Sequence, residues 1–325
     1  EFERIIPYQP LIREALRLAK HEPKALVIKS RKEMPTPELG STELDWDSWE
    51  EDSVPVDCVA LPASHPLYIL YTSGTTGRPK GTDLPPTMFA GGETVFVDLL
   101  EKNEFLVDFS SIDTQVAKDA KMLWINYPNN PTGAIANLEF FIEAVEFCKE
   151  FDIALMHDAC YTEVTYDGYV APSLLEVPGA MDIAIEFHSL SKTANMTGWR
   201  VGSAAGNPDL INALMRVKSN IDSGLSQAIQ EMGIEALSLS QEWLDSNNDI
   251  YKKRRDKVVS TLKEIGLDAL APKATLYIWT KVPEGYTSAS FTERLLEDVN
   301  VVVTPGNGYG SAGEGYIRLS LTIPD

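Results

Sequence analysis

The stretch that decides the fold covers residues 122–133 and reads MLWINYPNNPTG. Its first five residues are mostly apolar, as in a buried strand, and the rest are mainly turn formers, so we expect a strand that ends in a tight loop. Two more apolar stretches, 153–157 and 183–188, also run into polar residues. Helical periodicity over 138–150 separates the first strand from the second. Short strands that alternate with helices indicate βαβ units and a mainly parallel sheet, so the predicted fold class is α/β.

The same kind of pattern continues on both sides of this stretch. Further strands are predicted at 94–99 and 201–205, and helices at 11–18, 112–120 and 210–217. One long helix is then predicted over 227–263. The chain closes with strands predicted at 276–281, 301–303 and 316–321 around a helix at 291–299, which is typical of a smaller α+β domain.

Composition and charge narrow the class of protein. The 325 residues include 28 Lys and Arg against 48 Asp and Glu, a formal net charge of −20. Nucleic-acid and anionic-membrane binders need a basic surface, so we expect neither partner. The chain has no signal-peptide layout, no apolar run near the ~18 residues of a membrane span, and too few cysteines for a disulfide framework, so a cytoplasmic location is predicted. An acidic window over 43–52 is interpreted as a solvated loop.

Polar residues that could bind a ligand or take part in catalysis follow the three central strands. They are Asn130, Asp158, Tyr161, Ser189, Ser191, Lys192 and Arg200. Parallel strands present their carboxyl ends at one edge of the sheet, where such folds bind ligands. Taken singly, these residues also fit a turn, a helix cap or a surface lysine.

Taken together, they fit a site for pyridoxal phosphate. That cofactor needs a lysine amine for its aldehyde and a carboxylate for its pyridine nitrogen. It also needs donors for its phenolate oxygen, and hydroxyls with an arginine for its phosphate. His157 and His188 lack the spacing of metal ligands, so we expect them to pack or to support the residues of the site from behind, and we predict no metal site.

Four motifs in order strengthen this interpretation: NNPTG at 129–133, DACY at 158–161, SLSKTANMTGWR at 189–200 and YIRLS at 316–320. Residues 86–325 thereby resemble fold-type I aminotransferases of class I/II, and within that group the LL-diaminopimelate aminotransferases. The resemblance implies a three-layer α/β/α large domain of the PLP-dependent transferase type, here incomplete at its N-terminal side, with a smaller C-terminal α+β domain. It also implies amino-acid and 2-oxo-acid substrates, a role in lysine biosynthesis, a homodimer, and a cis peptide between Asn130 and Pro131.

The resemblance also gives each site residue a role. Lys192 would be the catalytic residue, which holds the cofactor and moves the substrate proton. The cofactor-binding residues would be Asn130, Asp158, Tyr161, Ser189, Ser191 and Arg200. Arg318, with Asn130, would bind the α-carboxylate of the substrate.

The N-terminal part resembles another family. Residues 72–81, TSGTTGRPKG, are similar to the phosphate loop of AMP-forming acyl-CoA synthetases of the acetyl/propionyl type. Glycines let the backbone approach phosphate oxygens there, and hydroxyls with Lys80 supply donors. We therefore predict a synthetase-like fragment at 1–84, a cofactor-binding large domain at 85–222, and a helical connection with the small domain at 223–325. Two alternatives to an aminotransferase stay open: an acyl-CoA synthetase fragment, and a non-catalytic hybrid that keeps only the scaffold.

Overall fold

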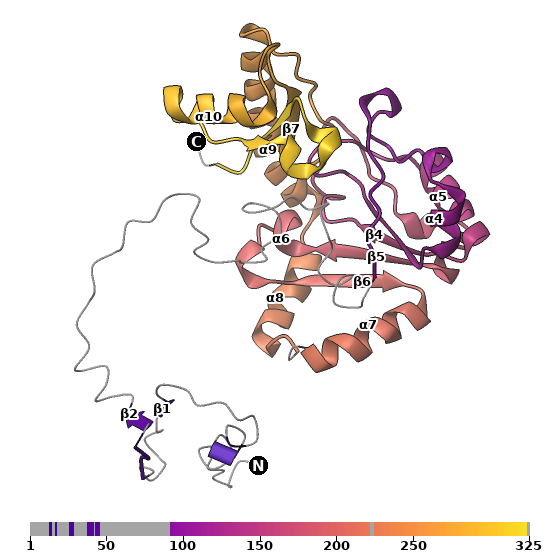
Figure 1. Cartoon of the computed structure of the whole chain (residues 1–325), viewed down its shortest axis with the longest axis vertical. Coiled ribbons are helices and arrows are strands. Elements are labelled where there is room, and N and C mark those ends of the chain that lie inside the picture. Colours follow the sequence, from indigo (N-terminus) through magenta and orange to yellow (C-terminus); the bar gives the residue numbers. More distant parts are fainter. Residues whose placement is uncertain are drawn as a thin grey trace. The chain divides into compact units, whose positions relative to one another are not determined.

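A computed structural model describes residues 92–221 and 224–323, together with residues 13, 14, 17, 26–28, 38–41 and 43–45 (Figure 1). The chain divides into two units, Glu1–Ile69 and Leu70–Asp325. The phosphate-loop-like segment 72–81 lies outside the described residues. The three-part division at residues 84 and 222 stays a prediction.

The described part of the first unit holds two short parallel strands, β1 (Leu26–Ile28) and β2 (Glu43–Asp45). Glu43 is buried, and its carboxylate accepts a hydrogen bond from Arg13 Nε at 2.7 Å. The interpretation of residue 43 as part of a solvated loop is therefore wrong. The ion pair with the Arg13 guanidinium offsets the cost of burying the Glu43 carboxylate. Of the helix predicted at 11–18, residues 13, 14 and 17 are described, and they are helical.

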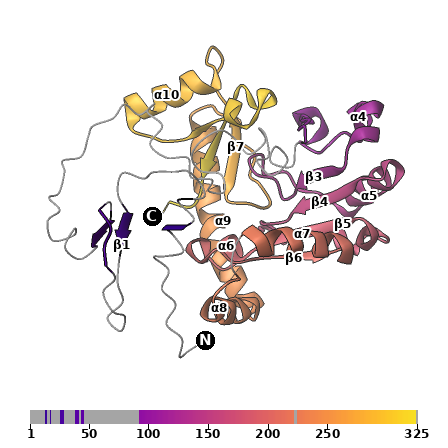
Figure 2. The same ribbon diagram turned by 60° about the horizontal axis from the view of Figure 1, so that its bottom comes forward.

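The second unit contains a four-stranded mixed sheet in the order β3-β4-β5-β6 (Figures 1 and 2). Its strands are β3 (Met122–Asn126), β4 (Ala154–Asp158), β5 (Ala184–Ser189) and β6 (Gly202–Gly206). The first three are parallel, and β6 pairs antiparallel to β5. The helices around the sheet are α4 (Thr114–Asp119), α5 (Leu138–Phe151), α6 (Leu190–Thr193) and α7 (Pro208–Ile221). The predicted α/β class is thus confirmed.

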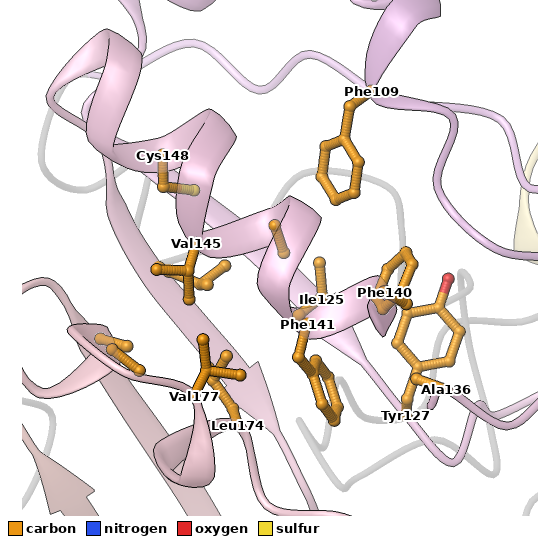
Figure 3. Packing of buried hydrophobic residues seen from close by; sticks show 14 of the residues in the cluster. Phe109, Ile125, Tyr127, Ala136, Phe140, Phe141, Val145, Cys148, Leu174 and Val177 are labelled. Atoms are coloured by element: carbon orange, nitrogen blue, oxygen red, sulfur yellow. The ribbon is translucent and has the colours of Figure 1, made fainter. Parts of the chain in front are cut away.

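Helix α5 anchors the main core of this unit. Asn137 caps its start by accepting the Phe140 N–H, and Asp152 in the left-handed region ends it. One face of α5, which includes Phe141, Val145 and Cys148, packs into the core shown in Figure 3. Full burial of a large apolar side chain such as Phe141 contributes about 1.5–3 kcal/mol, so this face fixes the helix on the sheet.

The C-terminal part is an α+β cluster built on a long helix. It comprises α8 (Gln227–Leu237), α9 (Gln241–Glu264), α10 (Ser288–Val299), and a sheet of β7 (Tyr277–Lys281), β9 (Tyr316–Ser320) and β8 (Thr304–Pro305) in that order. In both views α10 and β7 lie near one end of α9, and α8 lies at its other end (Figures 1 and 2). Both pairs of strands in this sheet are antiparallel.

Short 3-10 helices fill several connections. They are η1 (Glu101–Asn103), η2 (Phe109–Ser111), η3 (Leu174–Glu176), η4 (Ala180–Asp182), η5 (Thr197–Trp199), η6 (Gly306–Tyr309) and η7 (Ser311–Gly313). Within the residues that the structure describes, no helix combines the length and apolar character needed to cross a bilayer.

Three predicted elements are wrong in detail. Residues 94–99 form no strand, and Val95 and Phe96 are exposed there, because a strand needs a ladder partner as well as an apolar sequence. The helix predicted over 227–263 is broken into α8 and α9, since Ser240 caps the start of α9 by accepting the Trp243 N–H. The strand predicted at 301–303 lies instead at Thr304–Pro305, where β9 provides the pairing.

An ion pair ties the loop after β4 to α9 and generates a pH prediction. Asp167 accepts hydrogen bonds from Arg255 at 2.7 Å and from Lys252 at 2.8 Å, and these two partners lower its pKa from 3.8 to about 2. A carboxyl group whose pKa is lowered by folding stabilises the protein above its unfolded pKa and loses that effect as the pH falls through the folded value. We therefore expect Asp167→Asn to lower the free energy of unfolding at pH 7, with a deficit that shrinks between about pH 4 and pH 2.

Urea unfolding of the two proteins across this pH range measures the deficit. Asp249→Asn, on the exposed side of α9, is the matched control and should show a smaller change. A deficit for Asp167→Asn that stays constant down to pH 2 would contradict the assignment.

Candidate active site

The register of the parallel strands brings the predicted residues to one edge. Asn126 lies opposite Asp158, and Asp158 lies opposite Phe187, so β3, β4 and β5 end together. Ser189 is the last residue of β5, and α6, which carries Lys192, begins at the next residue. Asp158 and Ser189 thus end their strands, and the loop with Asn130 and the helix with Lys192 follow directly at the same edge of the sheet.

The loop that carries Asn130 is held by a side chain that sequence reasoning did not single out. Asn126 Nδ2 donates to the Asp158 carbonyl at 2.7 Å, and Asn126 Oδ1 accepts from the Asn130 N–H at 2.9 Å. One amide thus joins the end of β4 to the loop after β3. The peptide between Asn130 and Pro131 is cis, as the family resemblance implied.

The end of this loop requires glycine. Gly133 has a φ of +73°, and a Cβ on it would lie 2.9 Å from the Cβ of Pro272. Any other residue would meet both a strained backbone and a close contact with the rigid ring of Pro272. The glycine at the end of the NNPTG motif is therefore required by the backbone conformation and by the contact with Pro272.

Arg318 reaches this loop from the C-terminal sheet. It is 4% exposed, and its Nη1 donates to Asn130 Oδ1 at 2.9 Å. Its guanidinium carbon lies 4.1 Å from the ring centroid of Tyr277 and 5.2 Å from that of Tyr309. Stacking on aromatic faces and a hydrogen bond fix the plane of the fork, which suits bidentate recognition of a carboxylate. The structure thus brings together Asn130 and Arg318, two predicted substrate-binding residues that lie in separate motifs.

Tyr161 is buried next to Tyr277. Its hydroxyl donates to the Tyr277 hydroxyl at 3.2 Å, and burial, with Tyr277 nearby, raises the pKa of Tyr161 well above 10. Tyr161 is therefore a neutral phenol that can donate a hydrogen bond. Tyr277 contacts both Tyr161 and Arg318, yet it stands in no motif, and its position at the start of a predicted strand was its only signal in the sequence.

The remaining predicted residues follow β5. Ser189 Oγ caps α6 by accepting the Ser191 N–H at 3.2 Å, which leaves its own O–H able to donate elsewhere. Ser191 is buried, and Lys192 is half-buried. Arg200 is exposed, and the hydrogen bond that fixes it is local, from its Nη1 to the Thr197 carbonyl at 3.1 Å. The structure thus places Ser189 and Lys192 at the sheet edge. The Arg200 side chain is instead hydrogen-bonded within the loop that carries it.

A buried polar network lies directly behind the strand ends. His157 is fully buried, and its Nδ1 is 3.0 Å from the carboxylate of Glu186, which is 1% exposed. His188 Nε2 lies 2.8 Å from the same carboxylate. The sequence predicted that the two histidines pack or support the site, and the structure gives both a hydrogen bond to Glu186. Glu186 was missed, although an acid inside the apolar run 183–188 was a visible signal.

Among the described residues, no group of three or more His, Cys, Asp or Glu side chains is arranged to hold a metal ion. The chemistry of this edge is instead that of an amine, a carboxylate, a phenol, hydroxyls and a guanidinium.

Comparisons with known proteins assign this arrangement to a family. The model of the aminotransferase class I and II family matches residues 88–325, and the model of AMP-binding enzymes matches residues 8–85. The chain belongs to the aminotransferase class I and II family. Its second unit has the fold of the fold-type I aminotransferases.

Individual relatives agree with this assignment. The LL-diaminopimelate aminotransferase of Dehalococcoides mccartyi is 56% identical over 239 residues, 74% of this chain and 62% of that protein. A probable N-succinyldiaminopimelate aminotransferase from Thermus thermophilus has a TM-score of 0.70 at 36% identity, over 74% of this chain and 64% of its own. Substrate-bound BacF from Bacillus subtilis has a TM-score of 0.71 at 37% identity, over 74% and 62%. The chain thus spans about three fifths of the length of these relatives.

Asn126 provides a test of how the loop is held. Asn126→Asp replaces the amide donor with an acceptor that faces the Asp158 carbonyl, so we expect a loss of about 1–3 kcal/mol in the free energy of unfolding. Asn220→Asp is a matched control, because Asn220 also donates to a carbonyl, that of Arg216, but on the exposed α7. Urea unfolding at pH 7 compares the two, and equal losses would show that Asn126 has no special role.

Proposed function

We propose that this chain is a pyridoxal-phosphate-dependent aminotransferase that moves an amino group between an amino acid and a 2-oxo acid. The observation that carries the proposal is the convergence of Asn130, Asp158 and Lys192 at one sheet edge, with Arg318 hydrogen-bonded to Asn130. The names of relatives, which are LL-diaminopimelate aminotransferases, support LL-diaminopimelate as one of the amino acids of the reaction, and a role in lysine biosynthesis.

The residues present fit the cofactor. Tyr161 is a neutral donor because burial raises its pKa, and Ser189 keeps its O–H for a further acceptor while its oxygen caps α6. The cofactor would be held by Asn130, Asp158, Tyr161, Ser189, Ser191, Lys192 and Arg200. Bound there, pyridoxal phosphate supplies an aldehyde and an electron-accepting ring.

Each group of this chain then has a defined task. Asp158 would hold the proton on the ring nitrogen, since a carboxylate stabilises that positive charge. Tyr161 would donate to the phenolate oxygen in place of its hydrogen bond to the Tyr277 hydroxyl. The Lys192 amine would take a proton from the α-carbon of the substrate, as a general base, and would return one, as a general acid, to the aldehyde carbon of the cofactor on the other side of the substrate nitrogen.

Substrate orientation would fall to the residues around Arg318. Its fork would bind the α-carboxylate, and Asn130, which already accepts from Nη1, would share that carboxylate. The stacked Tyr277 ring keeps the guanidinium in one plane, so the α-carbon is presented in one orientation. The homodimer and the cytoplasmic location implied by the resemblance remain predictions.

Reconstitution with pyridoxal phosphate tests the role of Lys192. We expect the full chain to show the visible absorbance of a lysine-bound cofactor, and Lys192→Ala to lose both this band and transamination. Lys257→Ala, on the exposed side of α9, is the control and should keep both. A band that persists in Lys192→Ala would overturn the assignment.

Arg318→Lys tests the carboxylate fork. Lysine keeps the charge but cannot bind a carboxylate in a bidentate manner, so the KM for the amino donor should rise about tenfold or more, with a smaller change in kcat. Arg294→Lys, in an exposed ion pair with Asp298 on α10, is the control and should leave KM unchanged. Equal KM values for wild type and Arg318→Lys would remove Arg318 from the site.

The match of residues 8–85 to AMP-binding enzymes favours a second candidate, an ATP-dependent acyl-CoA synthetase activity. Exchange of pyrophosphate into ATP with acetate or propionate would support it, and failure to exchange would remove it. A protein that binds pyridoxal phosphate but converts no amino donor would be the non-catalytic hybrid.

A further inference from the structure

The carboxylate of Glu186 is buried, and both of its oxygens have two hydrogen-bonding neighbours each. Its Oε1 accepts from Ser173 Oγ at 2.9 Å and faces His188 Nε2 at 2.8 Å. Its Oε2 accepts from the Leu174 N–H at 2.8 Å and faces His157 Nδ1 at 3.0 Å. An ionised carboxylate offers about four acceptor positions, and all four are used here.

The two ring nitrogens of His157 both face acceptors. Nε2 lies 2.8 Å from the carbonyl oxygen of Tyr127, and a carbonyl can only accept, so Nε2 must carry a proton. Nδ1 faces an ionised carboxylate, which also only accepts, so this nitrogen carries a proton too. With Glu186 ionised, the hydrogen-bond geometry is that of the doubly protonated form of His157, with both ring N–H groups donating.

The charges around the pair agree with this assignment. Burial by itself would raise the pKa of Glu186, but hydrogen bonds from His157 and His188 outweigh it and hold this pKa well below its usual range. The hydrogen bond to Glu186, with Glu163 nearby, raises the pKa of His188. On the α5 side the ring of His157 contacts the apolar ring of Phe141, with 4.9 Å between centroids.

The pair acts on the loop that carries the substrate-binding residues. Tyr127, whose carbonyl His157 holds, lies three residues before Asn130, and Asn130 is hydrogen-bonded to Arg318. A continuous set of contacts thus runs from Glu186 in β5, through His157 in β4 and the loop after β3, to Arg318 in β9.

We propose that His157 is a positioning residue: doubly protonated and held by Glu186, it fixes the Tyr127 carbonyl and thereby sets Asn130 against Arg318. The protonation and the contact are argued from the hydrogen bonds of His157 alone. The effect on substrate binding rests on the proposed function.

The protonation is tested on the cofactor-free full chain by NMR of protein labelled with 15N-histidine. In wild type at pH 7 we expect both ring nitrogens of His157 to carry a bonded proton, and in Glu186→Gln only one. His188→Gln, which removes the other histidine from the same carboxylate, is the control and should leave both protons on His157. A wild-type His157 with one unprotonated nitrogen would overturn the proposal, and this measurement requires no variant to fold.

Two substitutions at His157 separate positioning from mere packing. Asparagine keeps a polar atom where Nδ1 stands and lacks one where Nε2 stands, whereas glutamine can reach the Tyr127 carbonyl. We expect His157→Asn to raise the KM for the amino donor about tenfold with a smaller change in kcat, and His157→Gln to stay within about threefold of wild type. Equal KM values for the two variants would contradict the positioning role.

A failure of the proposed function can be distinguished from a failure of the positioning role. If wild type itself converts no amino donor, the aminotransferase proposal fails, and the side-chain amide resonances of Asn130 in the cofactor-free protein decide the positioning role. These resonances should shift in His157→Asn and return toward wild type in His157→Gln. Unchanged resonances in both variants would overturn the proposal.

Discussion

The parallel pairing of β3, β4 and β5 is the constraint on which the rest of the structure depends. Because Asn126, Asp158 and Phe187 lie opposite one another in the ladder, the loops that follow the three strands leave the sheet at one edge. A shift of one residue in this register would send alternate side chains to the other face. Asp158 would then exchange faces with His157, and both the carboxylate of the site and the buried histidine would be lost.

Charged side chains can be buried in the described part of the second unit because they have partners. Glu186 has four donors, Arg255 has Asp167 and Asp256, and Arg318 has Asn130 with an aromatic face. A buried charge without such partners costs several kcal/mol, so these groups constrain the chain to one arrangement. The hydrogen-bonded ions therefore position the loops that apolar packing alone would leave adjustable.

The periodicity of apolar residues in the sequence predicted helices and strands well where the apolar face is in fact buried. Helix α5 shows apolar residues on one face, and that face is in the core. Helix α7 was also predicted from periodicity, yet none of its residues is buried. The stretch 94–99 has a strand-like sequence and forms no strand. Periodicity reports which face could be buried, and only packing partners decide whether it is.

The sequence by itself determined the α/β class, the residues at the strand ends, and the motifs that carry Asn130, Asp158, Lys192 and Arg318. These features are local, because turn formers, capping residues and apolar alternation act over a few positions. Tertiary structure alone decided that Arg318 meets Asn130, 188 residues away in the chain, that Tyr277 lies against both Tyr161 and Arg318, and that His157 is paired with Glu186. Such contacts join residues far apart in the chain, and their geometry follows from the packing of whole elements, which no local pattern contains.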